Sequence, residues 1–263
     1  MNLTGKTALV TGSTSGIGLG IALKLAEAGA DLILNGFGDA SAALVEVGRH
    51  GHKVGHHGAD VSDPAQIAEL FAYAERDFGG IDILVSNAGI ASSAPIEDTS
   101  LALWNRNMDI LSTGYFLVSR EGFRMLRTQG IGGAVVFVAS KNGLAASPNA
   151  SAYCTAKAAE IHLARCLALE GAEAGIRVNV INPDAVLRGS RIWEGEWLDQ
   201  RASTYGTDKE GLEEMYRKRS LLKRSVLPED IAEGVYFLTS DLSAKSTGNI
   251  LNVDAGNVQS FTR

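Results

Sequence analysis

The chain has 263 residues, of which 45% are hydrophobic and 21% are charged, and its net charge is −6. This composition supports a sizeable core, and the acidic balance without a basic stripe excludes a typical nucleic-acid-binding protein. The first residues lack the basic and apolar regions of a signal peptide, and no uncharged apolar run is long enough to span a bilayer. We therefore expect a soluble cytoplasmic protein that binds neither nucleic acid nor membranes.

Short apolar runs alternate with longer segments of helical periodicity along the whole chain. The runs that predict strands are residues 6–12, 30–36, 53–60, 82–89, 134–140, 177–183 and 248–256. Between them apolar side chains recur at helical spacing, as at Ile67, Leu70, Phe71 and Ala74. Alternating helices and apolar strands predict a parallel sheet that helices cover on both faces, and right-handed crossovers make it doubly wound.

The pattern thus predicts an α/β fold, with one Rossmann-type domain over residues 1–263 and about seven strands. An eightfold α/β barrel also alternates, but the glycine-rich turn after the first strand favours the open sheet. Residues 187–224 break the alternation, because Trp193 and Trp197 stand there among many charges without a strand pattern. This segment is either a substrate lid, which we favour, or an exposed amphipathic helix pair.

A glycine-rich turn follows the first predicted strand. The sequence TGSTSGIG, residues 11–18, leads directly into a predicted helix. Gly12, Gly16 and Gly18 allow a tight turn, close approach of the backbone to a pyrophosphate, and close packing of the helix on the strand. Because the helix N-terminus then faces the phosphates, we expect a dinucleotide-binding loop rather than glycines that only serve a turn.

Further motifs follow the later predicted strands. They are Asp60-Val61 after the third strand, Asn87-Ala88-Gly89 after the fourth, Ser140 after the fifth, and Tyr153-x-x-x-Lys157 downstream of it. With the glycine spacing of residues 11–18, they resemble the short-chain dehydrogenase/reductase family along the entire chain. The resemblance implies an oxidoreductase that acts on a small alcohol or carbonyl with a nicotinamide cofactor.

The resemblance also implies a catalytic set and a cofactor-binding set. The catalytic residues are Ser140, Tyr153 and Lys157. The cofactor-binding residues are Gly12, Ser15, Gly16, Ile17, Gly18, Phe37, Asp60, Val61, Asn87, Ala88, Gly89, Ile110, Tyr153, Lys157, Pro183 and Val186. In the family, the lysine holds the nicotinamide ribose and the serine polarises the substrate oxygen.

Tyr153 and Lys157 lie four residues apart on a predicted helix and therefore share one face. A phenol with a pKa near 10 is a poor base at neutral pH. A neighbouring ammonium and the positive nicotinamide lower the pKa of the phenol by favouring its ionised form. We therefore expect Tyr153 to be the general acid and base.

The cofactor is predicted to be NAD. An NADP site needs a cation for the 2′-phosphate, and neither residues 35–38 nor residues 13–15 contain one. The usual acidic partner of the ribose is also missing at the end of the second predicted strand. Asp39 is nearby and is either such a partner or a helix N-cap.

The sequence leaves several small compounds as alternatives for the substrate. Residues 1–96 resemble NAD-dependent 3-hydroxybutyrate dehydrogenases, although Ala91 and Ser92 lack the amide and imidazole that those enzymes place there. From Trp104 onward the chain instead resembles the dehydrogenase domain joined to rhamnulose-phosphate aldolases, as in a mosaic, which implies a lactaldehyde-type substrate. We expect a hydroxy acid, keto ester or hydroxy aldehyde. A non-catalytic NAD-binding regulator is the alternative of another class.

The family's catalytic asparagine is absent, because Leu111 occupies its position. Asn107, one turn earlier, either compensates or is a solvated helix asparagine, which we favour. In relatives the residue at this position supports a water through its main-chain carbonyl. A locally opened helix at Leu111 therefore preserves such a relay.

Two further expectations concern metals and assembly. His50, His52, His56 and His57 have no carboxylate or thiolate partners at ligand spacing, so we predict no metal site. Family members usually form tetramers through the helices after the fourth and fifth strands. Those helices carry Leu117, Val118, Leu163 and Leu167, which we interpret as more apolar surface than one sheet face needs. A homotetramer is predicted.

Overall fold

The computed structural model describes residues 2–194 and 196–261, and a parallel seven-stranded sheet lies at its centre. The strands are β1 (Thr7–Val10), β2 (Asp31–Asn35), β3 (Val54–His57), β4 (Ile83–Ser86), β5 (Gly133–Val138), β6 (Ile176–Pro183) and β7 (Ile250–Val253). Their order across the sheet is β3-β2-β1-β4-β5-β6-β7, and each neighbouring pair is parallel. All carboxyl ends therefore meet at one edge.

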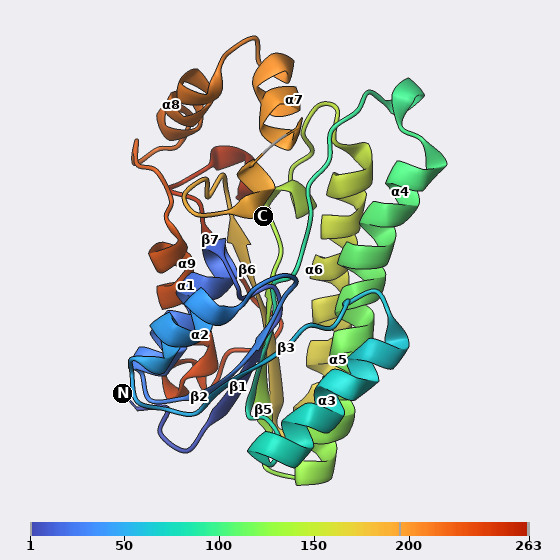
Figure 1. Cartoon of the computed structure of the whole chain (residues 1–263). Helices are drawn as coiled ribbons and strands as arrows, with labels where there is room; N and C mark the ends of the chain where they lie inside the picture. Colours follow the sequence, from blue (N-terminus) through green and yellow to red (C-terminus); the bar gives the residue numbers. More distant parts are fainter. Residues whose placement is uncertain (1, 195, 262–263) are drawn as a thin grey trace.

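Helices cover both faces of the sheet (Figure 1). They are α1 (Gly16–Glu27), α2 (Ser41–Gly48), α3 (Pro64–Phe78), α4 (Leu101–Asn107), α5 (Gly114–Gln129), α6 (Ser151–Gly171), α7 (Glu196–Thr204), α8 (Lys209–Arg219) and α9 (Pro228–Thr239). A π-helical stretch, η2 (Met108–Thr113), joins α4 to α5. Short 3-10 turns are η1 (Ile96–Asp98), η3 (Lys141–Gly143), η4 (Ala172–Ala174), η5 (Arg191–Trp193), η6 (Asp241–Ser243) and η7 (Val258–Ser260).

Two apolar cores lie on opposite sides of the sheet. Along β1, Leu9 packs with α3, α5 and α6 in one core, whereas Ala8 and Val10 pack with α1, α2 and α9 in the other. Successive strand side chains point to opposite faces, so a sheet covered on both faces needs apolar residues at every position. This requirement explains why the central strands β1, β4 and β5 are almost continuously apolar, whereas the edge strand β3 contains His56 and His57.

Local signals set the ends of α3 and attach it to the carboxyl edge. The Asp63 carboxylate accepts hydrogen bonds from the backbone N–H groups of Ala65 and Gln66, and Gly79 ends the helix with a φ of 76°. The Gln66 side chain also accepts a hydrogen bond from the backbone N–H of Asp60, at 3.0 Å. The helix cap therefore helps to fix the turn after β3.

The predicted fold is confirmed, since each predicted strand occurs in a single parallel sheet of the Rossmann type. Several strands are shorter than the apolar runs indicated. The run 53–60 contains β3 only over Val54–His57, and the run 248–256 contains β7 over Ile250–Val253. The remaining residues of these runs lie outside the strands. No helix in the described residues is long and apolar enough to cross a membrane.

The segment 187–224 forms η5, α7 and α8 above the carboxyl edge of the sheet (Figure 1). Leu198, Ala202, Leu212 and Tyr216 are buried in a separate small apolar cluster. The two helices therefore bury their apolar faces against each other instead of leaving them exposed.

The surface that we interpreted as a tetramer interface is largely buried within one chain. Leu117 and Val118 belong to the core under α5 and α6, and Leu163 and Leu167 pack against it. For Leu117 and Val118 the sequence interpretation is wrong, because these side chains cover the sheet of their own chain, whereas Leu163 and Leu167 stay partly exposed. Phe116 on α5 and Leu169 on α6 are exposed instead. The homotetramer stays a prediction.

Candidate active site

A cavity of about 350 Å³ opens at the carboxyl edge of the sheet. Every residue of the predicted catalytic and cofactor-binding sets lines it. It is also lined by Lys141 and Asp184, which the predicted sets do not contain, and by Trp197, Arg201, Tyr216 and Arg219 of the segment that we expected to be a lid. The volume lies in the range of small-molecule sites, and the position beyond the strand ends is where α/β sheets bind ligands.

The glycine loop between β1 and α1 leaves no space for side chains. Gly12 has a φ of 64°, and a Cβ atom there would lie 2.7 Å from the Cα atom of Ala88. A Cβ atom on Gly18 would collide with the carbonyl of Gly12. The Asn87 amide donates hydrogen bonds to the carbonyls of Thr11 and Gly12, at 2.9 and 3.0 Å. The turn is therefore fixed close to β4.

The N-terminus of α1 suits a phosphate group. The N-cap, Ser15, makes no capping hydrogen bond with its side chain, and the first turn contains no acidic residue. Residues 15–18 line the cavity. Free N–H groups and the positive end of the helix dipole favour an anion at this position, so the loop fits the pyrophosphate of a dinucleotide.

The end of β2 carries one cation that the sequence analysis missed. The Phe37 ring is 61% exposed at the cavity, and its carbonyl accepts a hydrogen bond of 3.3 Å from Arg191 of η5. Residues 35–38 and 13–15 contain no cation, but this guanidinium comes from a distant segment of the chain. Only the tertiary fold brings it there.

Asp39 lies before α2 and interacts with the first turn of that helix. Its carboxylate accepts hydrogen bonds from the backbone N–H and hydroxyl of Ser41, at 2.8 and 2.5 Å. Ala40, not Asp39, is the N-cap position. These hydrogen bonds lower the pKa of Asp39 and hold its carboxylate against the start of α2.

Ser140 and Tyr153 meet beyond the end of β5. The Ser140 hydroxyl accepts a hydrogen bond of 3.1 Å from the backbone N–H of Asn142, which starts η3. Burial raises the pKa of Tyr153, a hydrogen bond with Ser140 lowers it, and the charge of Glu160 raises it further. The protein alone therefore raises this pKa, whereas we expected Lys157 and the nicotinamide to lower it.

Burial is the main cause of this difference, and the ammonium of Lys157 has a carboxyl partner of its own. Its Nζ donates to Glu160 Oε2 at 3.0 Å and to the Val138 carbonyl at 3.2 Å. The same atom lies 5.9 Å from the centre of the Tyr153 ring and 5.3 Å from that of Tyr115. The ammonium next to the phenol is therefore held by Glu160 within α6.

Glu160 is a functional candidate that the sequence analysis missed. Its side chain is fully buried, and its Oε1 atom has no hydrogen-bond partner among the described residues. Burial raises the pKa of Glu160 to about 8, against the opposing effect of Lys157. The sequence does contain a signal for this residue. Glu160 is a charged residue three positions after Lys157, on the side of the helix that faces the core.

Asn107 is not the solvated residue that we favoured. Its side chain is fully buried, and its amide donates to the Ser92 hydroxyl and the Leu103 carbonyl, both at 2.8 Å. The next residues form η2, in which the backbone N–H of Gly114 bonds to the carbonyl of Asp109, five residues earlier. The helix is thus π-helical around Leu111, with a hydrogen bond over five residues instead of four. The main-chain relay at Leu111 stays a prediction.

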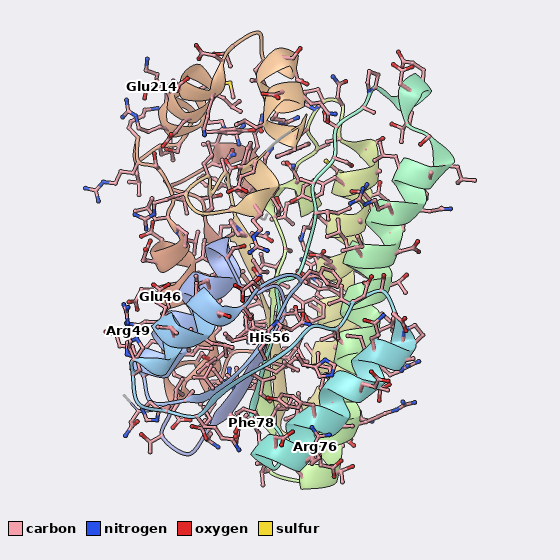
Figure 2. All side chains as sticks on the ribbon, viewed as in Figure 1. Glu46, Arg49, His56, Arg76, Phe78 and Glu214 are labelled. Atoms are coloured by element: carbon pink, nitrogen blue, oxygen red, sulfur yellow. The ribbon has the colours of Figure 1, made fainter. Side chains whose placement is uncertain are left out.

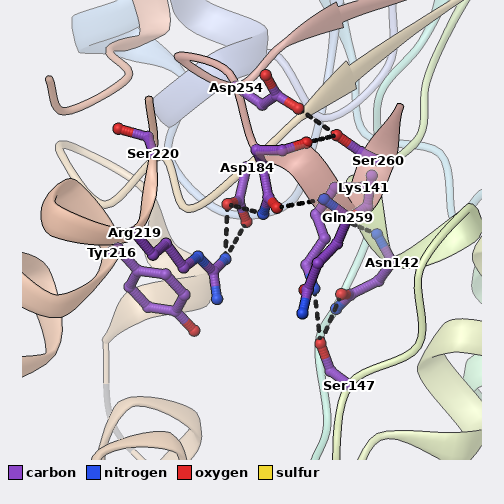
Figure 3. A network of polar contacts seen from close by, with 12 residues as sticks. Lys141, Asn142, Ser147, Asp184, Tyr216, Arg219, Ser220, Asp254, Gln259 and Ser260 are labelled. Carbon is purple, nitrogen blue, oxygen red and sulfur yellow. Dashed lines mark hydrogen bonds and ion pairs between the residues drawn. The ribbon is translucent and has the colours of Figure 1, made fainter. Parts of the chain in front are cut away.

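A polar network surrounds the cavity where β6 ends (Figure 3). Arg219 donates to both carboxylate oxygens of Asp184 at 2.6 Å, and Asn257 donates to the same carboxylate at 2.9 Å. Lys141 lies nearby and donates to the Ser147 hydroxyl at 3.0 Å. Asp184 follows β6 directly, and its partner Arg219 comes from α8.

The histidines near β3 have structural partners. His56 Nε2 lies 2.9 Å from the Gly36 carbonyl, and Figure 2 labels it between α2 and α3. The His57 ring packs at 5.6 Å from the Tyr73 ring. In the part of the chain that the structure describes, no group of three potential metal ligands occurs.

Comparison with known proteins places the chain among oxidoreductases. A family model described as enoyl-(acyl carrier protein) reductase matches residues 12–257. The chain is 45% identical to the uncharacterized oxidoreductase YuxG of Bacillus subtilis over 98% of this chain, but it spans only 38% of that protein. It is 41% identical to D-beta-hydroxybutyrate dehydrogenase of Cupriavidus necator, over 97% of this chain and 98% of that protein.

A solved structure also relates the chain to oxidoreductases. The crystal structure of a short-chain type dehydrogenase/reductase from Mycobacterium marinum matches with a TM-score of 0.87 and 33% identity, over 97% of this chain and 96% of that one. YuxG and the hydroxybutyrate dehydrogenase each align along nearly the whole chain, so the mosaic origin stays a prediction.

The buried pair of Lys157 and Glu160 predicts an unusual dependence of protein stability on pH. The pKa of Glu160 rises from 4.5 to about 8 on folding, so the native state binds more protons than the unfolded state between these values. Relative to Glu160→Gln, the free energy of unfolding of the wild-type protein therefore falls across this pH range. The slope is at most about 1.4 kcal/mol per pH unit.

Chemical denaturation of both proteins at several pH values measures this difference. Glu214→Gln is the control, because the hydrogen bond with Arg217 lowers the pKa of Glu214 to about 2, outside the range tested. A relative stability that rises with pH would show that Lys157 keeps Glu160 ionised, opposite to the effect of burial.

Proposed function

Because the chain belongs to the short-chain dehydrogenase/reductase family, we propose that it transfers a hydride between NAD(H) and a small secondary alcohol or its carbonyl. The observation that carries this proposal is the convergence of Ser140, Tyr153 and Lys157 on the cavity that the glycine loop also lines. A proton-transfer group and a dinucleotide loop in one cavity suit an alcohol dehydrogenase or carbonyl reductase.

NAD is the proposed cofactor, and the cavity offers a place for each part of it. The N-terminus of α1 would hold the pyrophosphate, while Asp60, Val61 and Phe37 would surround the adenosine. When bound, the nicotinamide accepts or returns the hydride. Arg191 is already hydrogen-bonded to the Phe37 carbonyl, and the loop of residues 13–15 lacks a cation, so we favour NAD over NADP.

Tyr153 is the proposed acid and base of the reaction. Its phenolate takes the hydroxyl proton during oxidation, and its phenol returns a proton during reduction. Ser140 is positioned to hydrogen-bond the same substrate oxygen, because it already interacts with the Tyr153 hydroxyl. Lys157 holds the ribose, and Glu160 fixes the ammonium in place.

Several finer features belong to this proposal. The substrate is a hydroxy acid, keto ester or hydroxy aldehyde, with 3-hydroxybutyrate and lactaldehyde as the specific alternatives. Residues 187–224 act as a lid, since Trp193, Trp197 and Tyr216 of this segment line the cavity. The protein works as a cytoplasmic homotetramer, to which exposed Phe116 and Leu169 contribute apolar contact surface.

Replacement of the phenol tests the catalytic assignment. Tyr153→Phe should lower kcat by about 10³, because general acid and base catalysis contributes about 10² to 10⁴. NADH affinity, measured by fluorescence, should stay within about threefold. Tyr73→Phe on α3 is the control and should keep kcat within about twofold. A Tyr153→Phe protein that keeps its kcat, or that loses NADH binding instead, refutes the assignment.

Cofactor preference is the second test. The wild-type kcat/KM for NAD should exceed that for NADP by at least about tenfold, which corresponds to roughly 1.4 kcal/mol. Phe37→Arg should narrow this gap by adding a cation for the 2′-phosphate. Equal use of both cofactors, with selective loss of NADP activity in Arg191→Ala, would instead assign the phosphate contact to Arg191.

The third test concerns the missing asparagine. If the main chain of η2 supports the relay, Leu111→Asn and Asn107→Ala should each change kcat by less than about tenfold, under roughly 1.4 kcal/mol of barrier. The kcat of both single variants and of the double variant decides the matter. A loss of about 10² in Asn107→Ala that Leu111→Asn rescues would assign the role to Asn107.

A further inference from the structure

Lys141 is a buried cation without an anionic partner. It follows Ser140 directly and lines the cavity, yet only 3% of its surface is exposed. Its Nζ donates to the Ser147 hydroxyl and forms no ion pair within the described residues. Burial lowers the pKa of Lys141, as expected for an ammonium in such surroundings.

Arg201 of α7 is a second cation of the same kind. It is 2% exposed and donates to the Tyr216 hydroxyl, the Pro148 carbonyl and the Tyr205 hydroxyl, at 3.2, 3.0 and 2.9 Å. All three acceptors are neutral, and no ion pair of Arg201 occurs among the residues that the structure describes. A buried guanidinium is costly unless an anion compensates it.

The carboxylate of Asp184 does not supply that anion. Asp184 already accepts two hydrogen bonds from Arg219 and one from Asn257 (Figure 3). Its charge raises the pKa of Lys141, whereas Arg219 and Arg201 lower it, so these groups act on one another across the cavity. Of the three cations only Arg219 is paired with this carboxylate, so Lys141 and Arg201 leave an excess of positive charge on this part of the cavity wall.

Lys141 and Arg201 have N–H groups without a hydrogen-bond partner among the described residues, and their number matches the acceptors of one carboxylate. Lys141 has three N–H groups and uses one, and Arg201 has five and uses three. Two N–H groups thus remain on each side chain, and a carboxylate offers about four lone-pair sites. In addition, the Trp197 Nε1 atom is buried without a hydrogen-bond partner among the described residues.

These groups lie close to the proposed catalytic centre. The Trp197 ring is 6.3 Å from the Tyr153 ring, and the Arg201 guanidinium lies 5.6 Å from the centre of the Trp197 ring. Lys141 is adjacent in sequence to Ser140. Lys141 is thus one residue, and Arg201 one ring, away from the groups that we propose to contact the substrate oxygen.

We propose that Lys141 and Arg201 form an anion subsite that binds the carboxylate of a small hydroxy acid or oxo acid. This inference rests on the proposed function and specifies its substrate class. Lys141 belongs to the body of the domain, and Arg201 to α7. Because both cations hold the same carboxylate, substrate binding also ties the segment 187–224 to the turn after β5.

If the subsite binds a carboxylate, the protein should oxidise hydroxy acids more efficiently than neutral diols with the same carbon skeleton. With NAD, the wild-type kcat/KM for 3-hydroxybutyrate or lactate should exceed that for 1,3-butanediol or 1,2-propanediol by at least about tenfold. Lys141→Met should reduce this ratio by at least about tenfold and leave kcat/KM for the diols within about threefold. Arg201→Gln should shift the ratio in the same direction.

Calorimetric titration without NAD(H) gives a second measurement that is independent of turnover. Acetoacetate should bind to the wild-type protein, and Lys141→Met should weaken its affinity at least about tenfold. Arg188→Gln is the matched control, because Arg188 is exposed, pairs with Glu229 and does not line the cavity. Its acetoacetate affinity should equal that of the wild-type protein.

The outcomes separate the two proposals. If the diols react as well as the acids and Lys141→Met changes neither, the subsite is refuted while the dehydrogenase activity stands. Tighter binding of glycerol 3-phosphate than of acetoacetate would refute the carboxylate assignment. If no alcohol is oxidised but acetoacetate binds through Lys141, the subsite stands and the proposed function fails.

Discussion

The parallel alignment of the strands is the constraint on which the site depends. Because all seven strands run in one direction, the turns that follow them meet at a single edge of the sheet. Gly12, Asp60, Asn87, Ser140 and Pro183 lie far apart in the sequence but line one cavity for this reason. Tyr153 and Lys157 reach the same cavity from α6. The fold thus supplies both the cofactor loop and the proton-transfer groups.

The second feature of the site is the pairing of its buried charged side chains. Lys157 contacts Glu160 inside α6, and Arg219 pairs with Asp184 beside the end of β6. Lys141 and Arg201 lack such partners within the described residues. Buried ions without partners are unfavourable in a stable fold, so their presence at a cavity supports the proposed anion subsite.

The sequence predicted the elements whose signals are local. Periodic apolar runs indicated the strands, and the glycine spacing with the Tyr153-x-x-x-Lys157 motif indicated the residues that line the cavity. Contacts between distant segments were not predictable in this way. Arg201 and Arg191 reach the cavity only because η5 and α7 fold over it, and the burial of Asn107 depends on Ser92 from another loop. Leu117 was misassigned because apolarity does not say which surface covers it.

Hydride transfer in this cavity is what distinguishes an enzyme from a protein that only binds a dinucleotide. Absorbance at about 340 nm, recorded while the protein, NAD and 3-hydroxybutyrate or lactate react, separates the two when the carbonyl product is measured in parallel. If the cavity transfers a hydride, NADH and carbonyl product form in equal amounts. Saturable NAD binding without NADH formation from any hydroxy acid or diol would contradict hydride transfer and would favour a non-catalytic NAD-binding regulator.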